Sequence, residues 1–264
     1  MSELILFGSP ASPPSRAVYW ACLLNELEFE YVQTEIDQMG ASAIIRSHNP
    51  ACQVPTLVDG DFALAEMPAI LAYLSDKHGW EDLYPSDIQT RAKINQYLHF
   101  HHNFTRNLSM RLMGTHVIST RILDAMGNVG DEVFMQLVRD PNKLANGQAV
   151  VTQIASLIEE SYFPDTCRYL CTEESPTIAD LACFEEVMAV NEAKLFEFSA
   201  FPKMAAWMEA MHDLPFYEPV HRYNIQLGDI REDSNTIERL VSAVEAGVNA
   251  LEQCKVRVSA LARD

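Results

Sequence analysis

The stretch from residue 49 to residue 74 reads NPACQVPTLVDGDFALAEMPAILAYL. Within it, residues 55–58 and 62–64 are strand-like runs on either side of Asp59-Gly60, a dipeptide that tolerates the positive φ angles of a tight hairpin turn. From residue 67 to residue 78 the apolar positions follow the spacing of one helix face. This stretch therefore predicts a β-hairpin that leads directly into a helix.

Strand and helix signals alternate upstream of this stretch. Residues 4–7 form an apolar run typical of a buried strand, and residues 29–34 carry the β-branched and aromatic side chains of a second strand. Between them, Ser12-Pro13-Pro14-Ser15 opens an apolar-periodic segment, because serine hydroxyls suit an N-cap and prolines are tolerated in a first helical turn. We therefore expect residues 1–80 to form one mixed α/β domain.

Helical periodicity replaces the strand signals downstream, over residues 87–223. Thr177 and Asp180 have the spacing of a capping box, in which two side chains satisfy free backbone amides at a helix start. We therefore expect a linker near residues 80–87 and an all-helical domain over residues 87–223.

Residues 224–264 are expected to form a C-terminal helical extension. Over residues 237–261, apolar side chains recur every seven positions, as on the buried stripe of an amphipathic helix. The stripe consists of Ile237, Val244, Leu251 and Val258, with Leu240 and Leu261 beside it. Packing of this helix on its own domain is preferred over an intermolecular coiled coil, which Gly247 weakens.

The composition is that of a folded globular protein. Hydrophobic residues make up 48% and charged residues 21% of the 264 residues, and this length suggests about two domains. With 19 Lys and Arg against 37 Asp and Glu, the formal net charge is −18, which repels phosphate backbones and anionic headgroups. We therefore expect no nucleic-acid or membrane partner. An acidic start without a signal-peptide pattern favours a cytoplasmic location, where the six cysteines stay reduced.

Four segments, taken in order, resemble the cytosolic glutathione transferases of the theta-like class. Residues 12–18, SPPSRAV, are similar to the Ser-x-Pro-Ser-Arg-Ala-Val signature of that class, and residues 49–57, NPACQVPTL, to the family's Asn-Pro-x-x-x-Val-Pro-x-Leu segment. Residues 60–74 resemble the pattern Gly-x-x-x-Leu-x-Glu-Ser-x-Ala-Ile-x-x-Tyr-Leu, and residues 176–181, PTIADL, the capping motif of the helical half.

This resemblance implies the glutathione transferase fold. In that fold an α/β thioredoxin-like N-terminal domain, here residues 1–80, binds glutathione, and an all-α C-terminal domain, here residues 87–223, binds the electrophile. The resemblance also implies that glutathione is the co-substrate and that the protein forms a homodimer.

Ser12 stands where the family places the hydroxyl that donates to the glutathione sulfur. A free thiol has a pKa of about 8.5, and moving it to about 6.5 requires roughly 2.7 kcal/mol of preferential stabilisation of the thiolate. A hydroxyl that donates to a charged acceptor supplies roughly 1.5–3 kcal/mol, and a helix amino terminus adds about 0.3–1 kcal/mol. One serine at a helix start therefore suffices. Taken alone, Ser12 and Ser15 are better interpreted as helix caps, but the four-motif pattern favours the donor role for Ser12, with Ser15 as the alternative donor.

The resemblance also implies the other glutathione contacts. Val54 is expected to present its backbone to the extended tripeptide, as a strand edge does, and the Val54–Pro55 bond is expected to be cis. Glu66 is expected to face the γ-glutamyl ammonium, although a helix dipole also favours an acid there. Gln53 replaces a lysine common in theta-like proteins, and Met67 replaces the family's serine. Only the Met67 amide then remains for the γ-glutamyl carboxylate, and one lost hydrogen bond lowers affinity about fivefold.

Arg106 lies in a segment that resembles the arginine region facing the sulfur in theta-like enzymes, with Asn107 where a second arginine is often found. A surface salt bridge is the alternative role for Arg106. His99, His101 and His102 suggest a metal at first sight. Only His99 and His102 share a helix face, however, and no carboxylate joins them at ligand spacing, so no metal is predicted.

These residues lead to one preferred function and one alternative. The preferred hypothesis is a detoxifying transferase that lowers the thiol pKa of glutathione and directs the thiolate at a small hydrophobic electrophile or an organic hydroperoxide. The alternative is a transferase-fold binding or assembly module with weak or no turnover, motivated by Gln53, Met67, the acidic N-terminal domain and the additional C-terminal helix. Redox catalysis through Cys52 is less favoured, because Ser12 stands where such enzymes place their thiol. The extension is hypothesised to cover the electrophile site.

Overall fold

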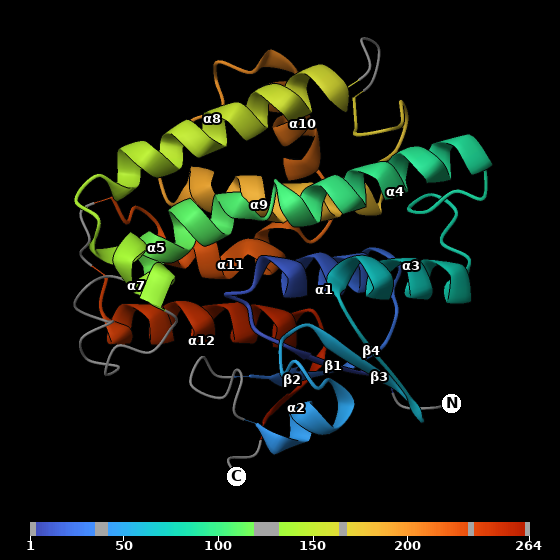
Figure 1. Ribbon diagram of the computed structural model, residues 1–264. Helices are drawn as coiled ribbons and strands as arrows, with labels where there is room; N and C mark the ends of the chain where they lie inside the picture. Colours follow the sequence, from blue (N-terminus) through green and yellow to red (C-terminus); the bar gives the residue numbers. More distant parts are fainter. Residues whose placement is uncertain (1–3, 35–41, 119–131, 164–167, 232–234, 262–264) are drawn as a thin grey trace.

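The computed structural model divides into a sheet domain and a larger body of helices packed on it (Figure 1). No helix among the described residues is both long and apolar enough to cross a lipid bilayer. The structure describes residues 4–34, 42–118, 132–163, 168–231 and 235–261.

The sheet has five strands among the described residues. They are β1 (Leu4–Gly8), β2 (Glu30–Gln33), β3 (Thr56–Asp59), β4 (Phe62–Ala65) and β5 (Arg257–Ala260), in the spatial order β4-β3-β1-β2-β5. Strand β1 runs parallel to β2 and antiparallel to β3, while β5 runs parallel to β2. The predicted hairpin is confirmed, because β3 and β4 pair antiparallel and Gly60 in their turn has a φ of 61°.

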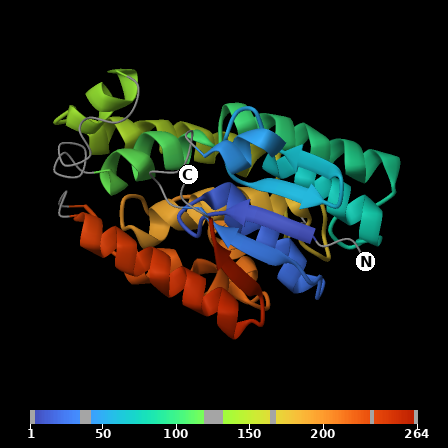
Figure 2. The same ribbon diagram turned by 90° about the horizontal axis from the view of Figure 1, so that it is seen from below.

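Among the described residues, three helices belong to the sheet domain: α1 (Pro13–Leu24), α2 (Ala43–His48) and α3 (Met67–His78). Helices α1 and α3 lie on the face toward the helical body, and α2 lies on the opposite face (Figures 1 and 2). Beneath α2 a small separate core includes Cys52, which is 1% exposed and whose thiol donates to the Ser42 carbonyl at 3.2 Å. Cys52 is therefore a packing residue in this structure.

Helices dominate the rest of the chain, as predicted. Within the described ranges they are α4 (Ile88–Asn103), the π-helix η2 (Leu108–Met113), α5 (Gly114–Val117), α7 (Glu132–Arg139), α8 (Lys143–Ser161), α9 (Ile178–Glu192), α10 (Pro202–His212), α11 (Tyr217–Leu227) and α12 (Ile237–Gln253). Helix α9 lies at the centre, where it packs against α1, α3, α4, η2, α10 and α11. Every residue from 178 to 190 is buried, so this helix has no solvent face over that length.

The capping box predicted at the start of α9 is confirmed. The Asp180 carboxylate accepts from the Thr177 amide at 2.7 Å, and it also accepts from Leu170 N at 2.7 Å and from Trp207 Nε1 at 2.9 Å. The cap thereby joins three segments of the helical body. The segment predicted as a linker is also packed here, because Leu83 is buried and its carbonyl accepts from Ile178 N at 2.9 Å.

The C-terminal extension differs from the predicted single helix. Helix α12 ends at Gln253 rather than at residue 261, because Lys255 takes a left-handed φ of 65°, and the chain then continues as β5. Figure 2 shows the dark red β5 beside the blue strands. Val258, placed on a helix stripe by the sequence, pairs instead with Tyr31 of β2. β-Branched residues fit such a strand, but the partner strand is too distant in sequence to be visible in the local pattern.

Helix α12 packs on its own chain, as preferred from the sequence. It lies along α11, and at Gly247 it approaches the loop between β1 and α1 so closely that an added Cβ would lie 2.7 Å from Cβ of Pro10. This close approach explains the glycine in the helix interior. The extension therefore contacts the loop that leads into α1.

Candidate active site

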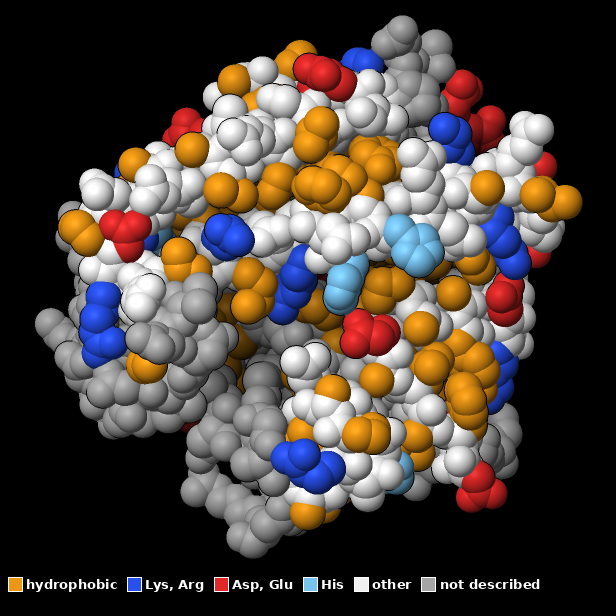
Figure 3. All heavy atoms as spheres, viewed as in Figure 1, with side chains coloured by type: hydrophobic (Ala, Val, Ile, Leu, Met, Phe, Trp, Pro, Cys, Tyr) orange, Lys and Arg blue, Asp and Glu red, His pale blue; other side chains and the backbone are white. Residues whose placement is uncertain are grey.

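Three of the predicted glutathione-binding segments meet at one end of the sheet. Strand β1 ends there at Gly8, β3 begins there at Thr56 and β4 ends there at Ala65, because Phe7 pairs with Thr56 and Thr56 pairs with Ala65. The loop to Ser12 follows β1, the Val54–Pro55 segment precedes β3, and Glu66 follows β4. Figure 3 shows a hollow where the helical body meets the sheet domain, close to the place where α1 begins in Figure 1.

Ser12 is the N-cap of α1 and is partly exposed. Its backbone is extended, with φ −88° and ψ 113°, and its hydroxyl oxygen accepts from Ser15 N at 3.4 Å. The hydroxyl hydrogen is free to point elsewhere, because a capping oxygen uses only a lone pair. Ser12 can therefore cap the helix and donate to a ligand at the same time.

Ser15 lies inside the same loop and is fully buried. Its hydroxyl oxygen accepts from Ser9 N at 3.4 Å, which braces the turn between β1 and α1. Gly8 permits this tight packing, because an added Cβ would lie 2.8 Å from Cε2 of Tyr31. The geometry gives Ser12, and not Ser15, a hydroxyl with access to the outside.

The Val54–Pro55 peptide bond is cis, as the resemblance implied. Pro55 is buried, Val54 is half-buried and Gln53 is exposed. The Gln53 carbonyl accepts from Thr56 Oγ1 at 2.7 Å and from Asn49 Nδ2 at 3.1 Å, so the asparagine of the Asn-Pro segment holds this turn from within. The backbone of Val54 therefore lies at the same end of the sheet as the Ser12 loop and Glu66.

Glu66 immediately precedes α3, with an exposed side chain that makes no cap hydrogen bond. Its φ of 70° lies in a region that L residues seldom adopt, and such strain gathers at ligand-binding positions. Met67, the first residue of α3, is 4% exposed, so its side chain belongs to the core. Only its backbone amide, at the helix amino terminus, is left for a ligand. The structure thus separates an exposed acid at residue 66 from a buried apolar side chain at residue 67.

Arg16 connects this loop to the helical body and is fully buried. Its Nη1 donates to the Pro10 carbonyl at 2.8 Å, and its Nε donates to Oε2 of Glu185 on α9 at 2.5 Å. The other oxygen of Glu185 is 3.1 Å from Nε2 of His221 on α11. Sequence reasoning missed Glu185 and His221, because neither lies in a motif and only the packing of α9 brings them to the arginine.

Arg106 follows α4 and its side chain is 31% exposed. Its Nη1 donates to Oε1 of Glu186 at 3.0 Å and also contacts the Ser109 hydroxyl. Burial raises the pKa of the Glu186 carboxyl, and the positive charge of Arg106 opposes that rise. Two adjacent residues of α9 therefore bind one arginine each: Glu185 binds Arg16 of the sheet domain, and Glu186 binds Arg106 of the helical body.

His101 is the buried histidine of the three, and His99 and His102 are exposed. Burial, followed by the positive charge of Arg106, lowers the pKa of His101 to about 3. Its Nε2 lies 4.0 Å from Oε1 of Glu186. Within the part of the chain that the structure describes, no three His, Cys, Asp or Glu side chains gather as metal ligands would.

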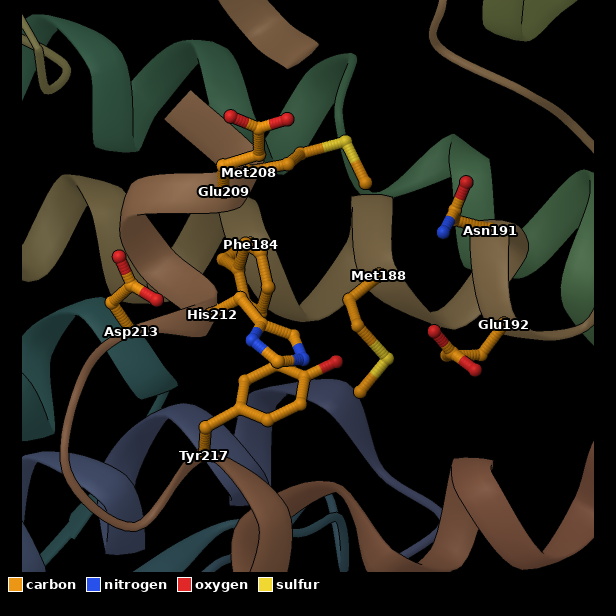
Figure 4. Close-up of a pocket in the computed structure, with 9 residues that line it drawn as sticks. All are labelled: Phe184, Met188, Asn191, Glu192, Met208, Glu209, His212, Asp213 and Tyr217. Atoms are coloured by element: carbon orange, nitrogen blue, oxygen red, sulfur yellow. The ribbon is translucent and has the colours of Figure 1, made fainter. Parts of the chain in front are cut away.

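A separate pocket of about 480 Å³ lies between α9, α10 and the start of α11 (Figure 4). Its lining combines an apolar floor with acids at the rim. The residues are Phe184, Met188, Asn191, Glu192, Met208, Glu209, His212, Asp213 and Tyr217. None of the predicted site residues lines this pocket, so it is distinct from the sheet end described above.

The sheet domain with its cis-proline turn, joined to a helical body around a central buried helix, defines a two-domain protein of the glutathione transferase fold. A family model described as "Glutathione S-transferase, N-terminal domain" matches residues 6–82. Glutathione S-transferase theta-3 of Mus musculus is 31% identical over 209 residues, which are 78% of this chain and 80% of that protein. The chain belongs to the glutathione S-transferase family, with relatives in the theta class.

Solved structures agree with this assignment. Apo human glutathione S-transferase T1-1 superposes with a TM-score of 0.72 at 26% identity, covering 92% of this chain and 98% of that one. Human glutathione transferase theta-2, in complex with glutathione and an unknown ligand, gives a TM-score of 0.69 at 25% identity, with 92% and 98% covered. The chain spans 36% of the longer glutathione S-transferase T2 of Arabidopsis thaliana, with 28% identity over 228 residues, or 83% of this chain.

Proposed function

We propose that this protein is a serine-type glutathione transferase, in which Ser12 stabilises the glutathione thiolate for attack on a small hydrophobic electrophile or an organic hydroperoxide. One observation carries the proposal: the Ser12 loop, the Val54–Pro55 turn and Glu66 come together at one end of the sheet. A tripeptide in extended conformation spans roughly 10 Å, which suits three adjacent strand ends about 4.8 Å apart.

Each segment has a distinct role in holding glutathione. The backbone of Val54 pairs with the central cysteine residue of the tripeptide, as a strand edge pairs with a peptide. Glu66 attracts the γ-glutamyl ammonium, and the backbone amide of Met67 binds the neighbouring carboxylate. Gln53 lies exposed beside them and adds a neutral hydrogen-bonding side chain rather than a cation. The similar human theta-2 protein was solved in complex with this same ligand, glutathione.

Ser12 supplies the activation. Its position at the amino terminus of α1 combines a hydroxyl donor with the positive end of the helix dipole. Together these supply roughly 2–4 kcal/mol in favour of the thiolate, enough to lower the pKa of the bound thiol by about two units. Ser15 remains a structural brace in this scheme, because its side chain is fully buried, whereas Ser12 is partly exposed.

Two reactions follow from a stabilised thiolate. In conjugation, the sulfur forms a bond to carbon while the bond to the leaving group breaks, and the leaving group departs with the electron pair. In hydroperoxide reduction, the sulfur attacks the distal oxygen, the O–O bond breaks, and the alkoxide takes a proton to become an alcohol. The resulting sulfenic acid condenses with a second glutathione to give the disulfide and water. Arg106 donates to the negative charge that develops on the departing atom in either case.

A homodimer is part of this proposal. Figure 3 shows apolar side chains gathered over β4 and α3 and again between α4 and α8 on one face. Exposed large apolar side chains on these elements include Phe62 of β4 at 47%, Leu157 of α8 at 42%, and Phe104, directly after α4, at 44%. Exposed apolar surface of this extent marks interaction sites, and a two-fold axis would bring the first patch of one copy onto the second patch of the other. We propose a cytoplasmic setting and a role in detoxification for this dimer.

The alternative, a transferase-fold binding module with little turnover, is motivated by Gln53 and by the loss of a hydroxyl at Met67. A pH titration of the absorbance of enzyme-bound glutathione distinguishes the two. For the enzyme, the bound thiol has a pKa well below about 8.5, and Ser12→Ala raises it by at least one unit. Ser15→Ala is the matched control and should leave that pKa in place. Binding of glutathione with no change of thiol pKa in Ser12→Ala would instead support the module.

A further inference from the structure

Arg106 is held on one side only. Both hydrogen bonds that its guanidinium donates use Nη1, to Glu186 and to Ser109. Its Nε and Nη2 have no acceptor among the described residues, although the guanidinium carries five N–H donors in a planar fork. The side chain is 31% exposed, and neither of these atoms is among the buried side-chain atoms without a partner, so the remaining donors are accessible from outside the cluster.

Glu186 is the group that fixes this orientation. The carboxylate is completely buried on α9, a helix that is itself enclosed on all sides, so its position cannot adapt to the arginine. An arginine tethered to a rigid buried acid loses much less side-chain freedom on binding a ligand than a free surface arginine does. Ser109, in the first turn of η2, adds a second fixed contact to the same nitrogen.

The same carboxylate also cancels the charge of Arg106. Glu186 lies 3.0 Å from Nη1, and Arg16, the other arginine near this part of α9, is already paired with Glu185. Two acids therefore match two arginines, and the cluster has no net charge to attract an anion. Coulomb attraction between a ligand and a lone guanidinium would be strong in a half-buried site, but here a carboxylate a few ångströms away opposes it.

We propose that Glu186 is a positioning residue for Arg106, and that the pair makes the site select electrophiles that are neutral in the ground state. The fixed N–H groups stabilise negative charge that develops only as the leaving atom departs. A ligand that already carries a carboxylate gains little binding affinity from them, because Glu186 opposes its charge. This inference rests on the proposed function, because it places the outward donors of Arg106 toward the electrophile.

The test uses two glutathione conjugates that differ by one charge, S-benzylglutathione and S-(4-carboxybenzyl)glutathione, with binding measured by titration calorimetry. The wild-type protein should prefer the neutral conjugate. In Glu186→Gln the hydrogen-bond geometry is retained but the negative charge is lost. The binding affinity for the carboxylated conjugate should therefore rise at least tenfold relative to the affinity for the neutral one. Glu192→Gln, on the same helix but lining the pocket of Figure 4, is the matched control and should leave the ratio within twofold.

A general loosening of the fold would weaken both conjugates alike, so an unchanged ratio in Glu186→Gln overturns the inference. Arg106→Met provides a second test if Glu186→Gln does not fold. With benzyl chloride as the electrophile, kcat should fall at least tenfold while KM changes less than twofold, and an unchanged kcat would overturn the inference. Failure of the wild-type protein to bind either conjugate would overturn the proposed function itself, together with this inference.

Discussion

His101 should make the protein less stable as the pH falls. The residue is 2% exposed, and burial together with Arg106 lowers its pKa in the folded protein to about 3. In the unfolded chain a histidine has a pKa of about 6.5. The folded state therefore binds fewer protons below that pH, and the free energy of unfolding decreases as pH falls through about 6.5 toward 3.

The size of this effect follows from the two pKa values. Between pH 7.5 and pH 5.0, the unfolded state gains about 2 kcal/mol from protonation of this histidine, and the folded state gains almost nothing. The assay is urea unfolding of wild-type protein and His101→Leu at both pH values and one protein concentration. The pH-dependent loss of stability should be about 2 kcal/mol smaller in the variant, because leucine does not titrate.

The control is His102→Leu, which removes the exposed neighbour on the same helix. It should leave the difference between the two pH values close to that of the wild-type protein. If the double difference for His101→Leu were below about 0.5 kcal/mol, the folded protein would be protonating His101 near the usual pKa. That result would refute the buried, neutral environment from which the magnitude is derived.

Three further changes have expected outcomes. Glu185→Gln should lower the free energy of unfolding by about 3 kcal/mol or more, because it leaves a buried arginine without its counter-charge, whereas Glu192→Gln should change it by less than about 0.5 kcal/mol in the same urea titrations. Gly247→Val should cost about 1–3 kcal/mol, since its Cβ collides with the β1–α1 loop, and Ser242→Val on the exposed side of α12 should not. Phe62→Asp should convert the proposed dimer to a monomer in sedimentation velocity, and an unchanged sedimentation coefficient would exclude β4 from the interface.

Local chemistry explains what the sequence could predict. The hairpin around Asp59-Gly60 and the capping box of Thr177 depend on residues a few positions apart, so their patterns are complete within one segment. The same is true of Ser12, which lies at a strand-to-helix junction that the prolines mark. Three of the loops in the candidate site were predictable because each carries its own short motif.

Packing explains what the sequence could not predict. Glu185 and Glu186 are neighbours in the chain yet face arginines from two different domains, and nothing in the α9 sequence indicates which acid meets which arginine. Strand β5 was missed for a related reason, because Glu30 and Arg257, which form an ion pair across β2 and β5, are 227 positions apart. Over such a short length the same apolar residues fit either a helix face or a strand. Only pairing with the distant strand β2 determines that residues 257–260 form a strand.

The position of β5 also bears on how the protein is made. During synthesis, strands β1 to β4 emerge from the ribosome well before β5. The edge of β2 therefore stays unpaired while the described helices of the body are synthesised. Assembly of this domain is therefore completed by a segment that emerges after the described helices, and a truncation that removes residues 257–260 would leave the unpaired edge of β2 free to pair with strands of other chains.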